Sequence, residues 1–201
     1  MPAGYSQQID RLTTGQINNI NDAVAGGLQS PTGLARYASQ LGERIALGNE
    51  TLKYNSTIGV VYAGLFQYVQ IDPAAVKVPA RGGLVFWKDY ENAIVTTDAA
   101  ANNLHAFAGV LLNAPTVGNF TFIQTLGKVF VQFKATITKA TPAIGDLVVV
   151  DAAPSNAADI PADATTLTGP LLKAWIGNAI LQTPVNGGLT LVELQPRSFV
   201  F

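Results

Sequence analysis

Residues 106–151 read AFAGVLLNAPTVGNFTFIQTLGKVFVQFKATITKATPAIGDLVVVD. Short runs rich in Val, Ile, Phe and Thr alternate here with Gly, Pro, Asn and Asp, a composition typical of β-strands separated by turns. Leu126 and Gly127 stand between two such runs, so the sequence predicts a tight hairpin at that point. The stretch therefore predicts a mainly β fold.

The same alternation of β-forming runs and turn residues extends through residues 56–201, which we expect to form one β domain. The runs read as strands cover residues 58–69, 84–87, 93–96, 106–112, 120–124, 128–134, 147–150, 171–181 and 189–194. Many short strands with few helical segments indicate a small β-barrel or sandwich. A second hairpin is expected at Gly187 and Gly188. Residues 151–168, rich in Ala, Asp, Pro and Thr, lack a sustained period and are expected to form an exposed loop.

Residues 1–55 differ in composition and are expected to form a partly helical N-terminal arm. Ser30 and Pro31 suit the start of a helix. That helix would place four apolar residues on one face, namely Leu34, Tyr37, Leu41 and Ile45. A stripe this narrow needs another surface to lie on. The arm packs either on its own domain or on a neighbouring subunit, and in the second case these four residues make the contact.

Charged residues are scarce in this chain. Asp, Glu, Lys and Arg supply 12 % of the 201 residues, with a net charge of −1, against about 25 % in ordinary soluble domains. Lys and Arg form no cluster, so direct binding to nucleic acid is not expected. No apolar run reaches the roughly 20 residues that span a bilayer, and the N-terminus lacks the features of a signal peptide. We expect a protein made in the cytoplasm, without a membrane partner, whose uncharged surface is covered by neighbours.

Residues that could perform chemistry are few. Cysteine is absent and His105 is the only histidine in the sequence, so neither a thiolate site nor a histidine-based metal site is expected. The residues before Gly127 do not fit a phosphate-binding loop. Asp89 and Glu91 lie two residues apart and would share one side of a strand. A cation site or an acid/base pair stays open for them, and a polar turn is favoured. We expect no enzyme activity, no cofactor and no metal.

The aromatic residues leave a different function open. Trp87, Trp175 or Tyr90 could stack against a sugar ring, which would make the chain a carbohydrate-binding β module. Because no Lys or Arg accompanies the other aromatic residues, we expect most of them to pack in the core.

Three short motifs follow one another within residues 106–151, namely Ala108-Gly109-Val110, Gly127-Lys128-Val129 and Gly145-Asp146-Leu147-Val148. In this order they resemble the small β-barrel, or β-tulip, of bacteriophage capsid decoration proteins, also called head cement proteins. Residues 175–180 and 187–194 resemble the closing strands of that family, so the resemblance covers residues 80–195. The N-terminal residues and residues 151–168 have no counterpart in its shortest members.

The resemblance implies a structural protein on the outside of an assembled phage head. Its partners would be the major capsid protein and further copies of itself, as a homo-oligomer, with a trimer at three-fold positions. Such a protein stabilises contacts between capsomers through the area that it buries, repeated over many copies. A role as a tail, baseplate or minor capsid protein is the alternative within the virion.

Overall fold

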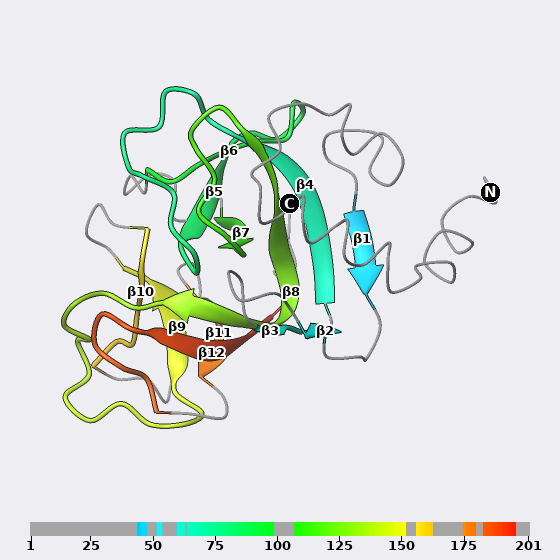
Figure 1. The fold of residues 1–201 in the computed structure, drawn as a ribbon. Helices are drawn as coiled ribbons and strands as arrows, with labels where there is room; N and C mark the ends of the chain where they lie inside the picture. Colours follow the sequence, from blue (N-terminus) through cyan, green and yellow to red (C-terminus); the bar gives the residue numbers. More distant parts are fainter. Residues whose placement is uncertain are drawn as a thin grey trace.

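The computed structural model describes residues 44–47, 52–53, 60–62, 64–98, 107–151, 156–162, 175–179 and 183–195. Within these ranges the chain forms strands and turns, with no helix (Figure 1). The prediction of a mainly β fold built as a barrel is confirmed. Of the runs expected as strands, residues 147–150 and 189–194 match the observed bounds, and most of the others are recovered with shifted ends.

Five strands close into a first barrel. They are β4 (Gly64–Ile71), β5 (Leu84–Asp89), β6 (Ile94–Thr96), β7 (Phe107–Leu111) and the first half of β8 (Phe120–Gln132). The strands neighbour one another in the order β4-β6-β5-β7-β8, and a direct pairing of β8 with β4 completes the circle. The β4–β6 pair is parallel and the other pairs are antiparallel.

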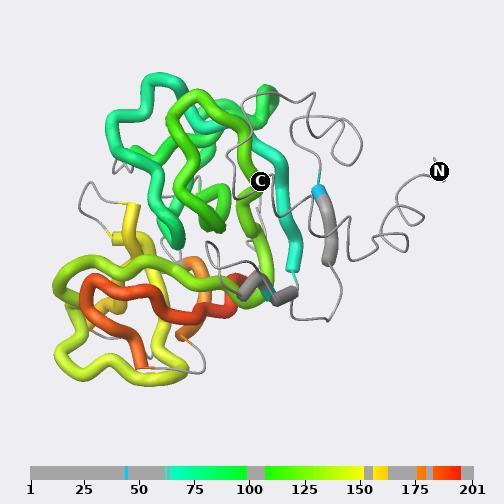
Figure 2. The backbone as a smooth tube through the Cα atoms, viewed as in Figure 1, coloured from blue at the N-terminus to red at the C-terminus, as the bar shows by residue number. Residues whose placement is uncertain are grey.

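The second half of β8 leaves this barrel and carries the same ten-stranded sheet into a second lobe. It pairs with β12 (Leu189–Leu194), which is followed by β11 (Trp175–Ala179), β9 (Leu147–Val150) and β10 (Ala158–Asp159). A bridge between Phe133 and Ala158 brings the residue after β8 back to β10 and curls this sheet upon itself. The two lobes are separate in Figure 2 and share the long strand β8.

The predicted hairpin at Leu126 and Gly127 is wrong, because β8 runs through these residues as one strand of 13 residues. The glycine instead has a φ of 93° next to a break in register, where Leu65 pairs with Leu126 but Phe66 pairs with Gln124. A glycine in this conformation suits a β-bulge as well as it suits a turn. The bulge bends β8 from the first barrel into the second lobe, and partner strands continue on both sides of it.

Two apolar clusters lie on opposite faces of the first barrel wall. The smaller cluster takes residues from all five barrel strands and from no other strand, as expected inside a barrel; it comprises Val69, Ile71, Val85, Val95, Ala108, Leu111 and Ile123. The larger cluster combines the other face of β4, β5, β7 and β8 with residues of β9 to β12. It therefore joins the two lobes, with Tyr68, Phe86, Phe122 and Phe133 as its largest fully buried members.

The predicted N-terminal helix is wrong where the structure tests it. Ile45 lies in strand β1 (Arg44–Leu47) and pairs with Phe66 of β4. The remaining contact residues Leu34, Tyr37 and Leu41 lie outside the described residues. The open edge of β4 supplies ladder hydrogen bonds to this segment, and tertiary pairing overrides a short helical spacing. Strands β2 (Leu52–Lys53) and β3 (Val60–Val61) pair as a small separate sheet.

The segment 151–168 is not a uniformly exposed loop. Asp151 and residues 156–162 are its described part; the latter contain β10, and both Ala158 and Ile160 have an exposed fraction of 0 %. Small alanines let this segment lie close to β9, and the carboxylate of Asp159 binds groups beyond the end of β8. The polar residues of this segment predicted an exposed loop. The sequence alone does not show that the carboxylate of Asp159 has partners within the fold, namely Lys134 and Thr138.

Candidate functional site

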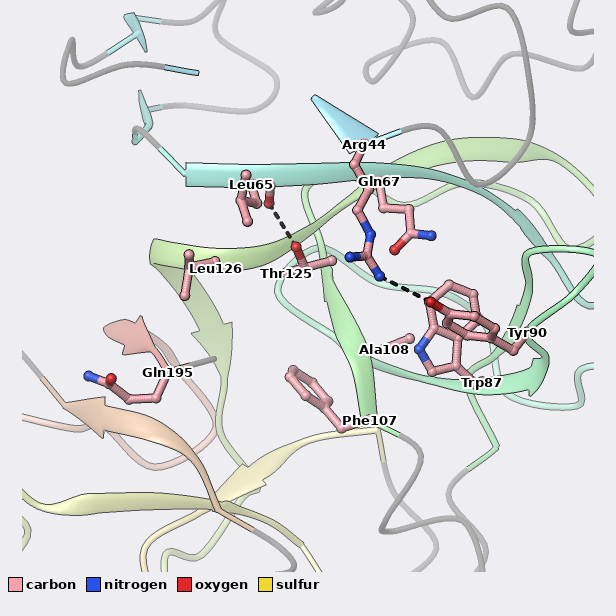
Figure 3. A pocket seen from close by; sticks show the side chains of 10 residues that line it. All are labelled: Arg44, Leu65, Gln67, Trp87, Tyr90, Phe107, Ala108, Thr125, Leu126 and Gln195. Carbon is pink, nitrogen blue, oxygen red and sulfur yellow. Dashed lines mark hydrogen bonds between the residues drawn. The ribbon is translucent and has the colours of Figure 1, made fainter. Parts of the chain in front are cut away.

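A pocket of about 200 Å³ opens at one end of the first barrel. Strands β4, β5, β7 and β8 supply most of its wall, so it is the mouth of the barrel, a common position for ligand sites. We call it the mouth pocket (Figure 3), and it is lined by Arg44, Leu65, Gln67, Trp87, Tyr90, Phe107, Ala108, Thr125, Leu126 and Gln195.

Strand alternation places Gln67 and Trp87 in this pocket. Gln67 shares the inward face of β4 with Val69, and Trp87 shares the inward face of β5 with Val85. The indole packs partly buried against the interior cluster, while the Gln67 residue is 5 % exposed. The floor of the pocket is therefore the barrel interior, capped by one aromatic ring and one amide.

Tyr90 adds a second aromatic ring at the rim. It lies in the turn after β5, is 61 % exposed, and meets Trp87 edge-on with ring centroids 5.0 Å apart and an interplanar angle of 74°. The turn is held by Asp89, whose carboxylate accepts hydrogen bonds from the backbone and side-chain nitrogens of Asn92. These hydrogen bonds lower the pKa of Asp89. The reading of Asp89 and Glu91 as part of a polar turn is thus confirmed, and Tyr90 is the residue of that turn that lines the pocket.

Arg44 reaches the pocket through the pairing of β1 with β4. Its register partner is Gln67, and its guanidinium donates a hydrogen bond to the hydroxyl of Tyr90 over 3.2 Å (Figure 3). Among the described residues, every ion pair joins a lysine to an aspartate and none includes Arg44. The rim therefore carries a positive charge that no described carboxylate neutralises.

These residues offer groups that can bind a small molecule. The pocket combines three aromatic rings, a guanidinium and amide groups, and the described residues of its lining include no carboxylate, histidine or cysteine to act as acid, base or nucleophile. Within the described ranges, no group of three or more His, Cys, Asp or Glu residues is placed to hold a metal ion.

A second feature lies at the opposite end of the first barrel, where residues 72–80 connect β4 towards β5. This segment, which we call the valine loop, exposes Val76 by 87 % and Val78 by 82 %. The carboxylate of Asp98 accepts hydrogen bonds from the backbone nitrogens of Val76 and Lys77 at 3.0 and 2.9 Å. The hydroxyl of Thr97 donates to the carbonyl of Lys77 over 2.6 Å. Two large apolar side chains are thus held in solvent by a loop with a fixed backbone.

Asp72 anchors the start of the valine loop. One carboxylate oxygen accepts a hydrogen bond from the backbone nitrogen of Ala74, and the other contacts the ammonium of Lys88. Burial of Asp72 opposes ionisation, but the hydrogen bonds from Lys88 and Ala74 and the charge of Lys88 outweigh it and lower the pKa of Asp72. The loop therefore keeps its anchor charged at neutral pH.

The other buried carboxylates are structural. Asp146 and Asp159 are 6 % and 7 % exposed and contact Lys139 and Lys134. Asp146 also accepts a hydrogen bond from the backbone nitrogen of Ala143 at 2.7 Å, which confirms its reading as a turn residue before β9. Because each buried carboxylate has a lysine partner, this group stabilises turns and strand ends of the second lobe.

The sequence identified part of the mouth pocket. It named Trp87 and Tyr90, which the structure brings together, and Trp175, whose backbone begins β11. His105 lies outside the described residues. The sequence analysis did not identify Arg44 and Gln67. They come together through the pairing of β1 with β4, which no local sequence pattern predicts.

The described residues contain no helix long and apolar enough to cross a membrane. No family model matches the sequence, and no curated protein matches it. Among solved structures, the chain is similar to the N-terminal base of the head fibre protein gp8.5 of bacteriophage phi29. The identity is 14 % and the TM-score 0.42, over 65 % of this chain and 92 % of that chain. A likeness this distant carries no argument about function.

Proposed function

We propose that this chain is a structural protein of a bacteriophage virion, and specifically a decoration protein that binds the outside of the head. Its partners are the major capsid protein and further copies of itself, with a trimer as the form that the family resemblance implies. It acts by burying surface across the seams between capsomers and performs no catalysis.

The valine loop is the observation that carries this proposal. A single exposed apolar side chain is common on protein surfaces, whereas exposed apolar side chains that lie together mark an interaction site. Here Val76 and Val78 are exposed while the backbone beneath them is fixed by Asp72, Thr97 and Asp98. A loop that is already ordered loses little conformational entropy on docking, so more of the burial energy appears as affinity.

The distribution of charge supports the same proposal. Among the described residues, four aspartates are buried and each contacts a lysine, namely Asp72, Asp146, Asp151 and Asp159. A chain already poor in charge therefore places part of that charge inside the fold. The remaining surface is unusually easy to desolvate, which suits a protein whose exterior becomes an interface.

The test uses heads purified from a phage strain in which the gene for this chain is disrupted. Purified wild-type protein should bind these heads at many copies, and cryo-microscopy should place it on their outer surface. The double variant V76D/V78D should bind about 100-fold more weakly, because two valine side chains at roughly 1.5 kcal/mol each no longer dock. Both positions are exposed, so the variant should fold like wild type.

The matched control is Ile144→Asp, which places the same charge on an apolar residue that is 61 % exposed on the second lobe. I144D should bind heads like wild type. Equal loss with I144D would reject the valine loop as the contact. Location in the tail or baseplate would assign another virion role, and absence from purified virions would reject the proposal altogether.

The arm contacts remain a prediction. Since β1 pairs with β4, the arm enters the barrel wall at Arg44, so residues before it start from a fixed point on the first barrel. Substituting Leu34, Tyr37 and Leu41 by serine in the full chain should weaken head binding and leave the melting temperature unchanged. Unchanged head binding would remove the arm from the interface.

A further inference from the structure

We propose that the mouth pocket binds one pyranose ring that carries a carboxylate, such as the terminal acidic sugar of a glycan. This inference goes beyond the proposed function and does not rest on it. The valine loop follows the C-terminal end of β4, whereas the mouth pocket uses Leu65 and Gln67 near the N-terminal end of the same strand. A protein bound through the valine loop would therefore leave the mouth pocket free.

The size of the pocket limits the ligand. Its volume of about 200 Å³ lies below the roughly 300–1,000 Å³ typical of sites for drug-sized molecules. A single ring with its substituents fits such a space, and an oligosaccharide would have to enter by its terminal residue. The open mouth of the barrel allows that approach, since the rest of a glycan can extend into solvent.

The aromatic residues fit the ring of a sugar. A pyranose has an apolar face of C–H groups and a polar edge of hydroxyls, so it suits a site that offers both surfaces. Trp87 and Tyr90 meet at 74° and form an apolar corner, and the tyrosine adds a hydroxyl at its rim. Gln67, Thr125 and Gln195 supply amide and hydroxyl groups around the same pocket.

Arg44 selects an acidic sugar over a neutral one. Its guanidinium already contacts the Tyr90 hydroxyl and has no described carboxylate partner, so it is placed to bind an anion beside the aromatic corner. The planar guanidinium matches a carboxylate through two parallel hydrogen bonds. Because the described lining contains one cation, Arg44, and no second lysine or arginine, it fits a singly charged carboxylate better than a phosphate dianion.

The test follows the indole N–H signal of Trp87 in the full chain by nuclear magnetic resonance. Methyl glucuronide, methyl glucoside and acetate are added in parallel, so that ring and carboxylate are probed together and separately. Methyl glucuronide should shift the Trp87 signal saturably, and methyl glucoside and acetate should each bind at least about tenfold more weakly, the value of one charge-assisted contact.

Two variants separate recognition from general charge. Arg44→Met should lower the affinity for methyl glucuronide about tenfold and leave that for methyl glucoside unchanged. Lys128→Met removes a positive charge from an exposed position of β8 outside the pocket lining and should bind like wild type. Equal binding of methyl glucoside, equal binding of acetate, no shift of Trp87, or equal loss in K128M would each overturn the assignment. None of these outcomes depends on attachment to phage heads.

Discussion

Replacing Asp159 by alanine should destabilise the second lobe more than any other single carboxylate change. Asp159 is 7 % exposed, and its carboxylate contacts the ammonium of Lys134 at 2.6 Å. It also accepts hydrogen bonds from the backbone nitrogen and hydroxyl of Thr138, at 2.8 and 2.6 Å. One side chain thus holds the segment after β8 against β10, where the sheet of the second lobe curls upon itself.

The magnitude follows from what D159A leaves behind. Hydrogen bonds to charged groups contribute about 1.5–3 kcal/mol each, but the Lys134 side chain is 23 % exposed and still faces Asp151 at 3.5 Å. Solvent and Asp151 recover part of the loss, so we expect about 3 kcal/mol. In a protein of this size each kcal/mol shifts Tm by about 2–4 °C, which gives a drop of roughly 6–12 °C.

Thermal and urea unfolding followed by far-ultraviolet circular dichroism measure this effect. The control is Asp89→Ala, because Asp89 also accepts hydrogen bonds in a turn but lies at the surface, and its variant should melt close to wild type. If D159A and D89A melt at the same temperature, the assignment of Asp159 as the clasp of the second lobe is refuted.

The decrease of the unfolding free energy at high pH gives a second measurement of the contact between Asp159 and Lys134. Burial of Lys134 favours its neutral form, but the hydrogen bonds and charges of Asp159 and Asp151 outweigh it and raise the pKa of Lys134. A raised lysine pKa gives stability that is complete below the unfolded value of about 10.4 and is lost as pH rises through the folded value. D159A should therefore make this decrease smaller.

Two further predictions concern the first barrel. Gly127→Ala should lower the free energy of unfolding by about 1–2 kcal/mol, since an L side chain is strained at a φ of 93°; urea midpoints measure it, and a midpoint like that of Lys128→Ala would contradict the bulge. Asp72→Asn should flatten the acid limb of stability. The lowered pKa of Asp72 gives stability that is present above its unfolded value, about 3.9, and lost as pH falls through the folded one. An acid limb parallel to that of wild type would contradict the anchor.

Local sequence patterns predicted most strands, because the residue types within a strand differ from those in the turns that bound it. β9 and β12 are runs of branched and apolar residues bounded by turn residues, and their ends were predicted to the residue. Gly127 was misread because a glycine with positive φ serves a turn and a bulge equally. The choice depends on whether strands pair on both sides, which is a property of the whole sheet.

The mouth pocket was predictable only in its aromatic half. Trp87 and Tyr90 lie three residues apart, so chain proximity alone places them near each other. Arg44 lies 46 residues from Tyr90 and meets it through the register of β1 on β4. The prediction that residues 156–162 form an exposed loop was wrong for a similar reason. The charge of Asp159 suggests solvent exposure, and its lysine partner, Lys134, is known only from the structure.

The shared strand β8 couples the two lobes mechanically. The valine loop is fixed between β4 and β5, and β4 pairs with β8 over most of its length. A load on the loop therefore passes through ladder hydrogen bonds into β8 and from there into β12. Pulling such a loop away requires shearing many hydrogen bonds at once, whereas a terminal tether could peel one bond at a time. An attachment point of this kind suits a protein that has to hold neighbouring subunits together under tension.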